Sequence, residues 1–116
     1  MRTYKEFHGD LPISDIGKEL RRILKMEVHH FKVLTGYGST TGSSKSKTMV
    51  LKSLSKLKKD ALIQGYFPGE VKNEPLTSQS PYYEAKMQYG SLVKNDPDYG
   101  NDGIIFVFIK RNKGEI

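Results

Sequence analysis

The chain has 116 residues, of which 36% are hydrophobic and 28% charged, and its formal net charge is +6 at pH 7. This length predicts one domain with a single core. The sequence has no cysteine, which excludes a disulfide framework and a thiolate metal site and fits a reducing cytoplasm. Because it lacks both an apolar run near the roughly 20 residues of a membrane helix and a signal-peptide plan, we expect a cytoplasmic protein without a membrane partner.

The first predicted elements are a short strand and a helix. Residues 3–7 alternate weakly between apolar and polar types, which is typical of a strand. After a turn, Pro12 or Ser14 is expected to begin a helix that ends near Met26. Its outer face would be basic and would carry Lys18, Arg21, Arg22 and Lys25.

A glycine- and serine-rich segment, residues 35–47 (TGYGSTTGSSKSK), follows a strand predicted over residues 30–34. A strand, a glycine-rich turn and a helix N-terminus together bind anions, because the first N–H groups of a helix have no partner within it. The glycine spacing differs from both the Walker A and the dinucleotide patterns. The segment therefore predicts a phosphate-facing loop that is not a nucleotide triphosphate site. The alternative is an exposed flexible linker.

The helix predicted over residues 45–63 has two unlike faces. One face is apolar, and its members are Val50, Leu54, Leu57 and Ala61. The opposite face carries Lys45, Lys52, Lys56 and Lys59. Asp60 is the only carboxylate in the helix, so the stripe has a single sign and indicates an anionic partner.

The positive charge belongs to the first half of the chain. Residues 1–64 hold 13 Lys and Arg against 6 Asp and Glu, whereas residues 65–116 hold 6 against 7. Charge concentrated in one part of a domain favours nucleic acid as the partner. An anionic membrane surface is disfavoured, because neither basic helix combines its lysines with bulky exposed aromatic residues.

The second half is predicted to hold a short strand near residues 63–67 and a last strand at 103–111, whose unbroken apolar run is typical of burial on both faces. Between them, residues 72–102 are the least regular stretch, with a helix expected from Ser80-Pro81 to about Val93. The spacing of three aspartates before the last strand does not match an EF-hand, and we interpret them as turn residues. They are Asp96, Asp98 and Asp102.

This order of elements, together with two short motifs, resembles the Smr (small MutS-related) domain family. Residues 6–9 (EFHG) stand where the family has D-L-H-G, and residues 35–38 (TGYG) stand where it has H-G-x-G. Gly103 precedes the apolar last strand, as a glycine does in the family. The resemblance covers one domain, residues 1–116, apart from an inserted loop or helix at about 72–102.

The resemblance implies an α/β (α+β) two-layer sandwich in the order βαβαββ. Its mixed four-stranded sheet would carry two helices on one face, as in the C-terminal domain of bacterial initiation factor three. The family binds nucleic acid, and several members nick DNA or cleave RNA. His8 and Gly9 match the first motif and Gly36 and Gly38 the second, whereas Glu6 replaces Asp and Thr35 replaces His.

Three hypotheses follow. The first is a module that binds DNA or RNA without chemistry, in which Tyr37 stacks on an unpaired base. Its candidate contacts are Thr35, Gly36, Tyr37, Gly38, Ser39, Gly42, Lys45, Lys47, Lys52 and Lys56.

The second hypothesis is a structure-selective endonuclease with Glu6, His8 and Asp10 as catalytic residues. Glu6 or Asp10 would act as a base or hold Mg²⁺ or Mn²⁺, and His8 would move a proton. The alternative for His8 is a turn residue that bonds local backbone. The third hypothesis is a protein-interaction domain that uses the tyrosine-rich residues 72–93, for which the alternative is a helix packed over one sheet face.

Overall fold

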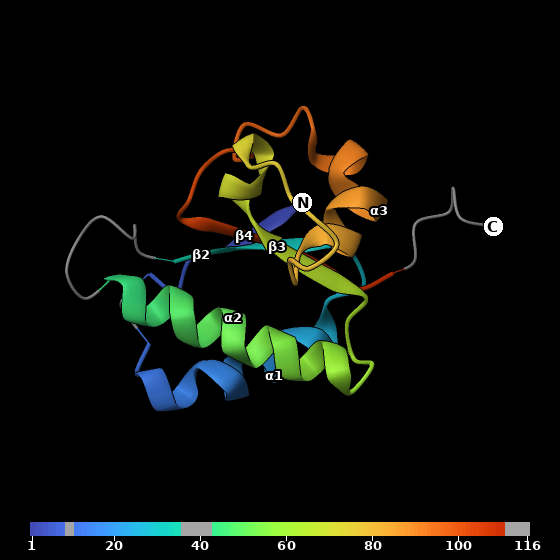
Figure 1. Ribbon diagram of the computed structural model, residues 1–116. Helices are drawn as coiled ribbons and strands as arrows, with labels where there is room; N and C mark the ends of the chain where they lie inside the picture. The colour runs from blue at the N-terminus through green and yellow to red at the C-terminus, as the bar shows by residue number, and fades with distance from the viewer. Residues whose placement is uncertain (9–10, 36–42, 111–116) are drawn as a thin grey trace.

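The computed structural model describes residues 1–8, 11–35 and 43–110 and shows a small α+β domain (Figure 1). Its strands are β1 (Arg2–Tyr4), β2 (Phe31–Leu34), β3 (Gly65–Pro68) and β4 (Ile104–Phe108). Its helices are α1 (Ile16–Met26), α2 (Ser43–Lys59) and α3 (Tyr83–Val93), with short 3₁₀ turns η1 (Ile13–Asp15) and η2 (Gly69–Asn73). The element types therefore follow the predicted order, with α3 inserted before the last strand.

The four strands form one mixed sheet in the order β1-β2-β4-β3. β1 pairs with β2 in parallel, and β4 runs antiparallel to both of its neighbours, β2 and β3. The last strand in sequence is thus an inner strand of the sheet, and all five of its residues are buried. This confirms the prediction of a strand buried on both faces, because an inner strand with helices above and below has no solvent-facing side.

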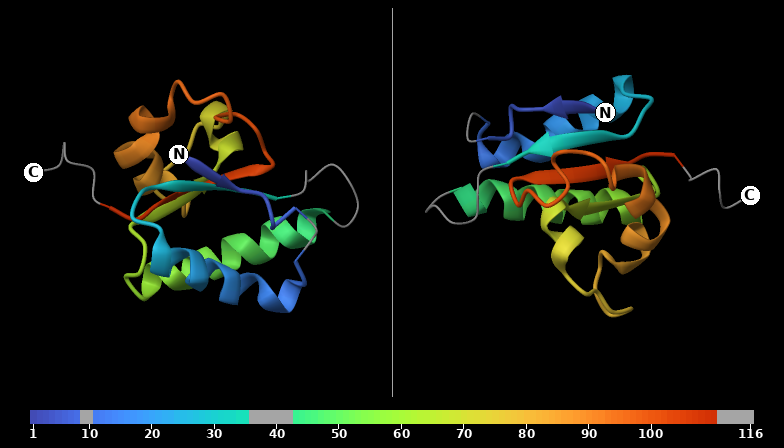
Figure 2. Two further views of the ribbon diagram at one scale, coloured as in Figure 1. Left: turned by 180° about the vertical axis from the view of Figure 1, so that it is seen from behind. Right: turned by 90° about the horizontal axis from the view of Figure 1, so that it is seen from above.

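Helices α1 and α2 cover one face of the sheet (Figures 1 and 2). Side chains alternate along a strand, so Phe31 and Val33 of β2 point to this face together with Ile105 and Val107 of β4. They meet a helical stripe that comprises Ile16, Leu20, Ile23, Val50, Leu54 and Leu57. Two helices on one face of a mixed sheet is the arrangement that we expected.

The opposite face of the sheet is covered by η2, α3 and the chain around them (Figure 1). Ile104, Phe106 and Phe108 point to this side and would be exposed without that cover. Tyr89 of α3 stacks on Phe108 with ring centroids 4.3 Å apart and planes 8° from parallel. The structure therefore has a helical layer on each face, not the two-layer arrangement that we expected.

Helix α2 ends at Lys59, four residues before the predicted end. Ala61 has a positive φ of 61°, and the next N–H, that of Leu62, donates to the Leu57 carbonyl at 2.9 Å. This left-handed cap terminates the helix. Ala61 is consequently exposed, so the prediction that it belongs to the apolar face is wrong, and Ile63 reaches the core instead.

Candidate nucleic-acid interface

Charge is segregated between the two helical layers. Helices α1 and α2 carry ten Lys and Arg against one Glu, a formal charge of +9. Residues 69–102, which form the opposite layer, carry three Lys against six Asp and Glu, a formal charge of −3. Apart from one ion pair between α2 and η2, Lys47 with Glu70, the sheet separates the two layers, so the α1–α2 side of the molecule presents a positive field to solvent.

The whole predicted lysine stripe lies on the surface of α2. Its members Lys45, Lys52, Lys56 and Lys59 are exposed and follow one another at intervals of seven, four and three residues, which places them on one side of the helix. Lys47, a predicted phosphate contact, lies outside this stripe. Its side chain is only 14% exposed and forms an ion pair with Glu70 of η2, so its ammonium group is already neutralised.

A hollow of about 280 Å³ lies between α1 and α2. We call it the polar hollow, and it is lined by Ser14, Gly17, Lys18, Arg21, Ser53, Lys56 and Leu57. The helices approach closely here, because a Cβ on Gly17 would lie 3.9 Å from the Ser53 Oγ. Three cations and two hydroxyl groups thus converge, and none of the described residues that line the hollow is acidic.

A second hollow, of about 440 Å³, lies between α1 and the chain just after the end of α2. We call it the apolar hollow, and it is lined by Arg21, Leu24, Lys25 and Leu62. Arg21 lines both hollows, so they are neighbours. Of the seven residues around the polar hollow, only Lys56 was among the contacts predicted from sequence. The basic outer face of α1 was evident in its spacing, but its pairing with α2 depends on the tertiary structure.

The first of the two family-like motifs, EFHG, contacts the start of α2. The buried Ser46 donates a hydrogen bond from Oγ to the Phe7 carbonyl at 2.5 Å, which ties the turn at residues 5–8 to α2. His8 is exposed, and its backbone N–H donates to the Lys5 carbonyl at 3.1 Å, as expected of a turn residue. Gly9 and Asp10 lie outside the described residues.

Glu6 points toward α1, where it shares a small charged cluster with Glu19 and Arg22. Arg22 donates from Nε to the Glu19 carboxylate at 2.7 Å, and its Nη2 lies 3.4 Å from Glu6 Oε2. Burial raises the pKa of Glu6, and its hydrogen bond with Glu19 raises the pKa further. The Arg22 hydrogen bond holds the pKa of Glu19 at about 2.

This cluster does not fit a divalent metal. Its nearest cation is the guanidinium of Arg22, and the described residues contain no group of three or more His, Asp or Glu that could hold a metal ion.

Of the glycine- and serine-rich segment 35–47, the structure describes Thr35 and residues 43–47, which begin α2. Gly36, Tyr37, Gly38, Ser39 and Gly42 lie outside the described residues. Thr35 is fully buried; its N–H donates to the Gly103 carbonyl at 2.7 Å and its hydroxyl to the same oxygen at 3.1 Å. Thr35 thus joins the end of β2 to the glycine before β4, and its side chain faces the interior, away from a surface ligand.

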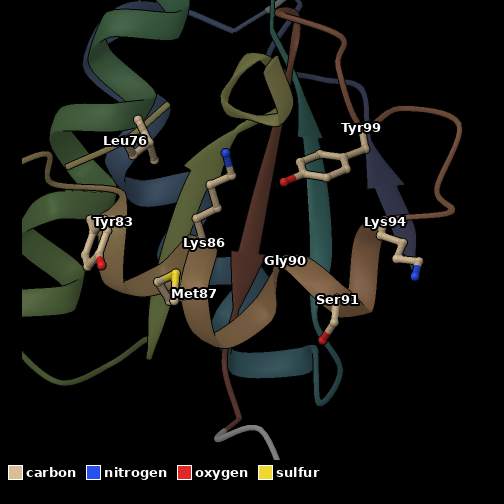
Figure 3. A pocket seen from close by; sticks show the side chains of 8 residues that line it. All are labelled: Leu76, Tyr83, Lys86, Met87, Gly90, Ser91, Lys94 and Tyr99. Carbon is tan, nitrogen blue, oxygen red and sulfur yellow. The ribbon is translucent and has the colours of Figure 1, made fainter. Parts of the chain in front are cut away.

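The tyrosine-rich segment serves mainly to pack α3 on the sheet. Tyr89 is buried, and Tyr82 makes an edge contact with Tyr66 at 5.8 Å. Tyr83 and Tyr99 line a shallow hollow of about 390 Å³ beside α3, together with Leu76, Lys86, Met87, Gly90, Ser91 and Lys94 (Figure 3). The packed helix, the alternative to a binding surface, accounts for residues 83–93 of the segment, and protein interaction at this hollow stays a hypothesis.

The fold and the site together define a small α+β domain with one strongly basic helical layer. Comparison with protein-family models, with curated proteins and with solved structures finds no significant match to the chain. The likeness to the Smr family thus stays a prediction. Among the residues that the structure describes, none belongs to a helix with the length and apolarity needed to cross a membrane.

Proposed function

We propose that this chain is a nucleic-acid-binding domain of the Smr-like type, and that the exposed cations of α1 and α2 contact the sugar-phosphate backbone. The observation that carries the proposal is the charge segregation, +9 on the α1–α2 layer against −3 on residues 69–102. Exposed lysines of one sign bind a polyanion chiefly by releasing its condensed counterions. The absence of cysteine agrees with a cytoplasmic location.

Two features of the fold support the Smr-like part of the proposal. The elements other than α3 and the 3₁₀ turns follow the order βαβαββ, which the resemblance implies together with a likeness to the C-terminal domain of initiation factor three. The Ser46–Phe7 hydrogen bond also brings the EFHG turn beside the helix that follows the glycine-rich loop.

The salt dependence of binding tests the proposal. A double variant, Lys45→Gln with Lys52→Gln, removes two exposed charges of α2 that line neither hollow. The slope of log K against log salt should fall by about 0.7–0.9 for each lost phosphate contact. The matched control is Lys72→Gln with Lys94→Gln, two exposed lysines of the opposite layer, which should leave the slope unchanged. Equal effects of the two pairs would refute the proposal.

Endonuclease activity is a second candidate function, favoured by the position of the His8 turn beside α2. A screen of branched DNA and single-stranded RNA, with Mg²⁺, with Mn²⁺ and with a chelator, tests for it. Cleavage by this chain should disappear in the double variant Glu6→Gln with His8→Gln. Cleavage that survives the double change would come from a contaminant.

A further inference from the structure

We infer that the groove between α1 and α2 binds one nucleotide of a single strand, with its phosphate in the polar hollow and its unpaired base in the apolar hollow. This inference rests on the proposed function and specifies which form of nucleic acid the basic layer prefers. It assigns a site outside the two motifs that resemble the Smr family.

The polar hollow has the chemistry of a phosphate site. Lys18 and Arg21 of α1 face Lys56 of α2 across it, and the hydroxyl groups of Ser14 and Ser53 add neutral donors. Hydrogen bonds from cations to a phosphate are stronger than neutral ones, and the arginine fork can bind two phosphate oxygens at once. The single acid of α1, Glu19, is bonded to Arg22 and does not line the hollow.

The apolar hollow has the chemistry of a surface for a base. Leu62 is 50% exposed, although it is a large apolar side chain, and it lies opposite Leu24 of α1 in this hollow. The left-handed Ala61 precedes Leu62 and ends α2 just before it. A nucleobase has two apolar faces, and it can pack on aliphatic side chains or on the plane of an arginine guanidinium.

Because the two hollows are neighbours, they favour a ligand whose phosphate and apolar group lie close together. Arg21 lines both, so a phosphate in one and an apolar group in the other must be close neighbours, as they are within one nucleotide. The polar hollow, of about 280 Å³, is just below the range of pockets that enclose a whole small molecule, roughly 300–1,000 Å³, and the apolar hollow, of about 440 Å³, is in its lower part. In a duplex the base is paired and stacked, so only an unpaired base can reach Leu24 and Leu62.

The test compares a single-stranded oligonucleotide with an abasic strand of equal length and charge, in both DNA and RNA forms, by fluorescence anisotropy. The wild-type chain should bind the strand with bases about five- to tenfold more tightly, at the lower end of what base contacts contribute. Leu62→Gln should remove this preference and leave binding of the abasic strand unchanged. Leu92→Gln is the matched control, because Leu92 is 49% exposed and lies on α3 in the opposite layer.

A second variant tests the phosphate half of the site. Lys18→Gln with Lys56→Gln should weaken binding of both strands by the same factor, because each strand keeps its phosphates. If the wild-type chain binds the abasic strand as tightly as the strand with bases, and the affinity still falls with salt, the nucleotide site is overturned but the proposed function stands. If neither strand shows saturable binding, both the nucleotide site and the proposed nucleic-acid-binding function are overturned. All variants change exposed side chains, and circular dichroism melting confirms that each one is folded.

Discussion

Lys32 of β2 is a buried cation that two aspartates neutralise. Its Nζ donates to Asp98 Oδ2 at 2.8 Å and to Asp96 Oδ1 at 3.0 Å. Burial acts to lower the pKa of Lys32, but the hydrogen bonds to Asp98 and Asp96 outweigh it, so the pKa is raised. A raised lysine pKa contributes stability that is complete below about pH 10.5 and is lost only at higher pH. Two of the three aspartates predicted to be turn residues, Asp96 and Asp98, thus anchor the 94–102 segment to the sheet.

Lys32→Met should therefore destabilise the fold. It leaves two carboxylates beside β2 without their cation, and we expect a loss of about 2–3 kcal/mol in the free energy of unfolding. This is below the 3–5 kcal/mol typical of a fully buried pair, because Asp98 retains 32% of its side-chain exposure. Urea denaturation measures the change, with the exposed Lys94→Met as control. A loss no larger than that of the control would contradict this role.

The ionised carboxylates of Glu19 and Glu6 should have opposite effects on the stability of the fold. The pKa of Glu19 is lowered to about 2, so its contribution to stability is complete above about pH 4.5 and is lost as pH falls toward 2. Glu19→Gln should accordingly lower the melting temperature at pH 7, and the difference from wild type should vanish near pH 2.

The pKa of Glu6 is raised, so folding disfavours its charged form, and Glu6→Gln should cost no stability at pH 7. Thermal melts of Glu19→Gln and Glu6→Gln from pH 2 to 7 measure both effects. The same change in melting temperature in both variants would contradict the prediction.

At the scale of elements, the end of α2 holds a residue of the wrong type for its conformation. Ala61 has φ of 61°, a region that costs a residue with a Cβ about 1–2 kcal/mol and that glycine adopts freely. Ala61→Gly should therefore stabilise the fold by about 0.5–1 kcal/mol, after the greater chain entropy of glycine is deducted. Ser55→Gly, at an exposed position within α2, should destabilise it by a similar amount. Urea midpoints measure both changes, and a less stable Ala61→Gly variant would refute the cap.

Several elements could be predicted because their signals are local. The apolar run of β4 indicated burial on both faces, and the 3.6-residue spacing in α1 predicted its end at Met26. The end of α2 could not be predicted, because neither glycine nor proline marks it and the left-handed turn falls on an alanine. Likewise, the weak alternation of residues 3–7 predicted a strand to Phe7, whereas β1 ends at Tyr4 and the chain then turns to contact Ser46.

The candidate site was predictable only in part, because some of its contacts join residues far apart in the sequence. The lysine stripe of α2 follows from helical periodicity, so Lys45, Lys52 and Lys56 are exposed as expected. The side chains of Lys47 and Thr35 bond to residues far along the chain, Glu70 and Gly103. No local pattern in the sequence predicts these partners. The polar hollow requires Gly17 and Ser53 to meet, and that contact joins residues 36 positions apart.

At the scale of the whole molecule, the sheet holds two layers of opposite charge apart. The α1–α2 layer is the side on which a polyanion should dock, and residues 69–102 should repel it. This asymmetry distinguishes nucleic-acid binding from protein interaction at the hollow beside α3, because the two hypotheses use opposite sides of the sheet.

The most direct measurement is a titration of the ¹⁵N-labelled chain with a single-stranded oligonucleotide at low salt, followed by amide chemical shifts. The account predicts saturable shifts that concentrate on α1 and α2 and are largest around Arg21, Ser53 and Lys56, while the amides of α3 stay unchanged. Shifts that concentrate on α3 and the hollow beside it, or no saturable shift on α1 and α2, would contradict the central claim.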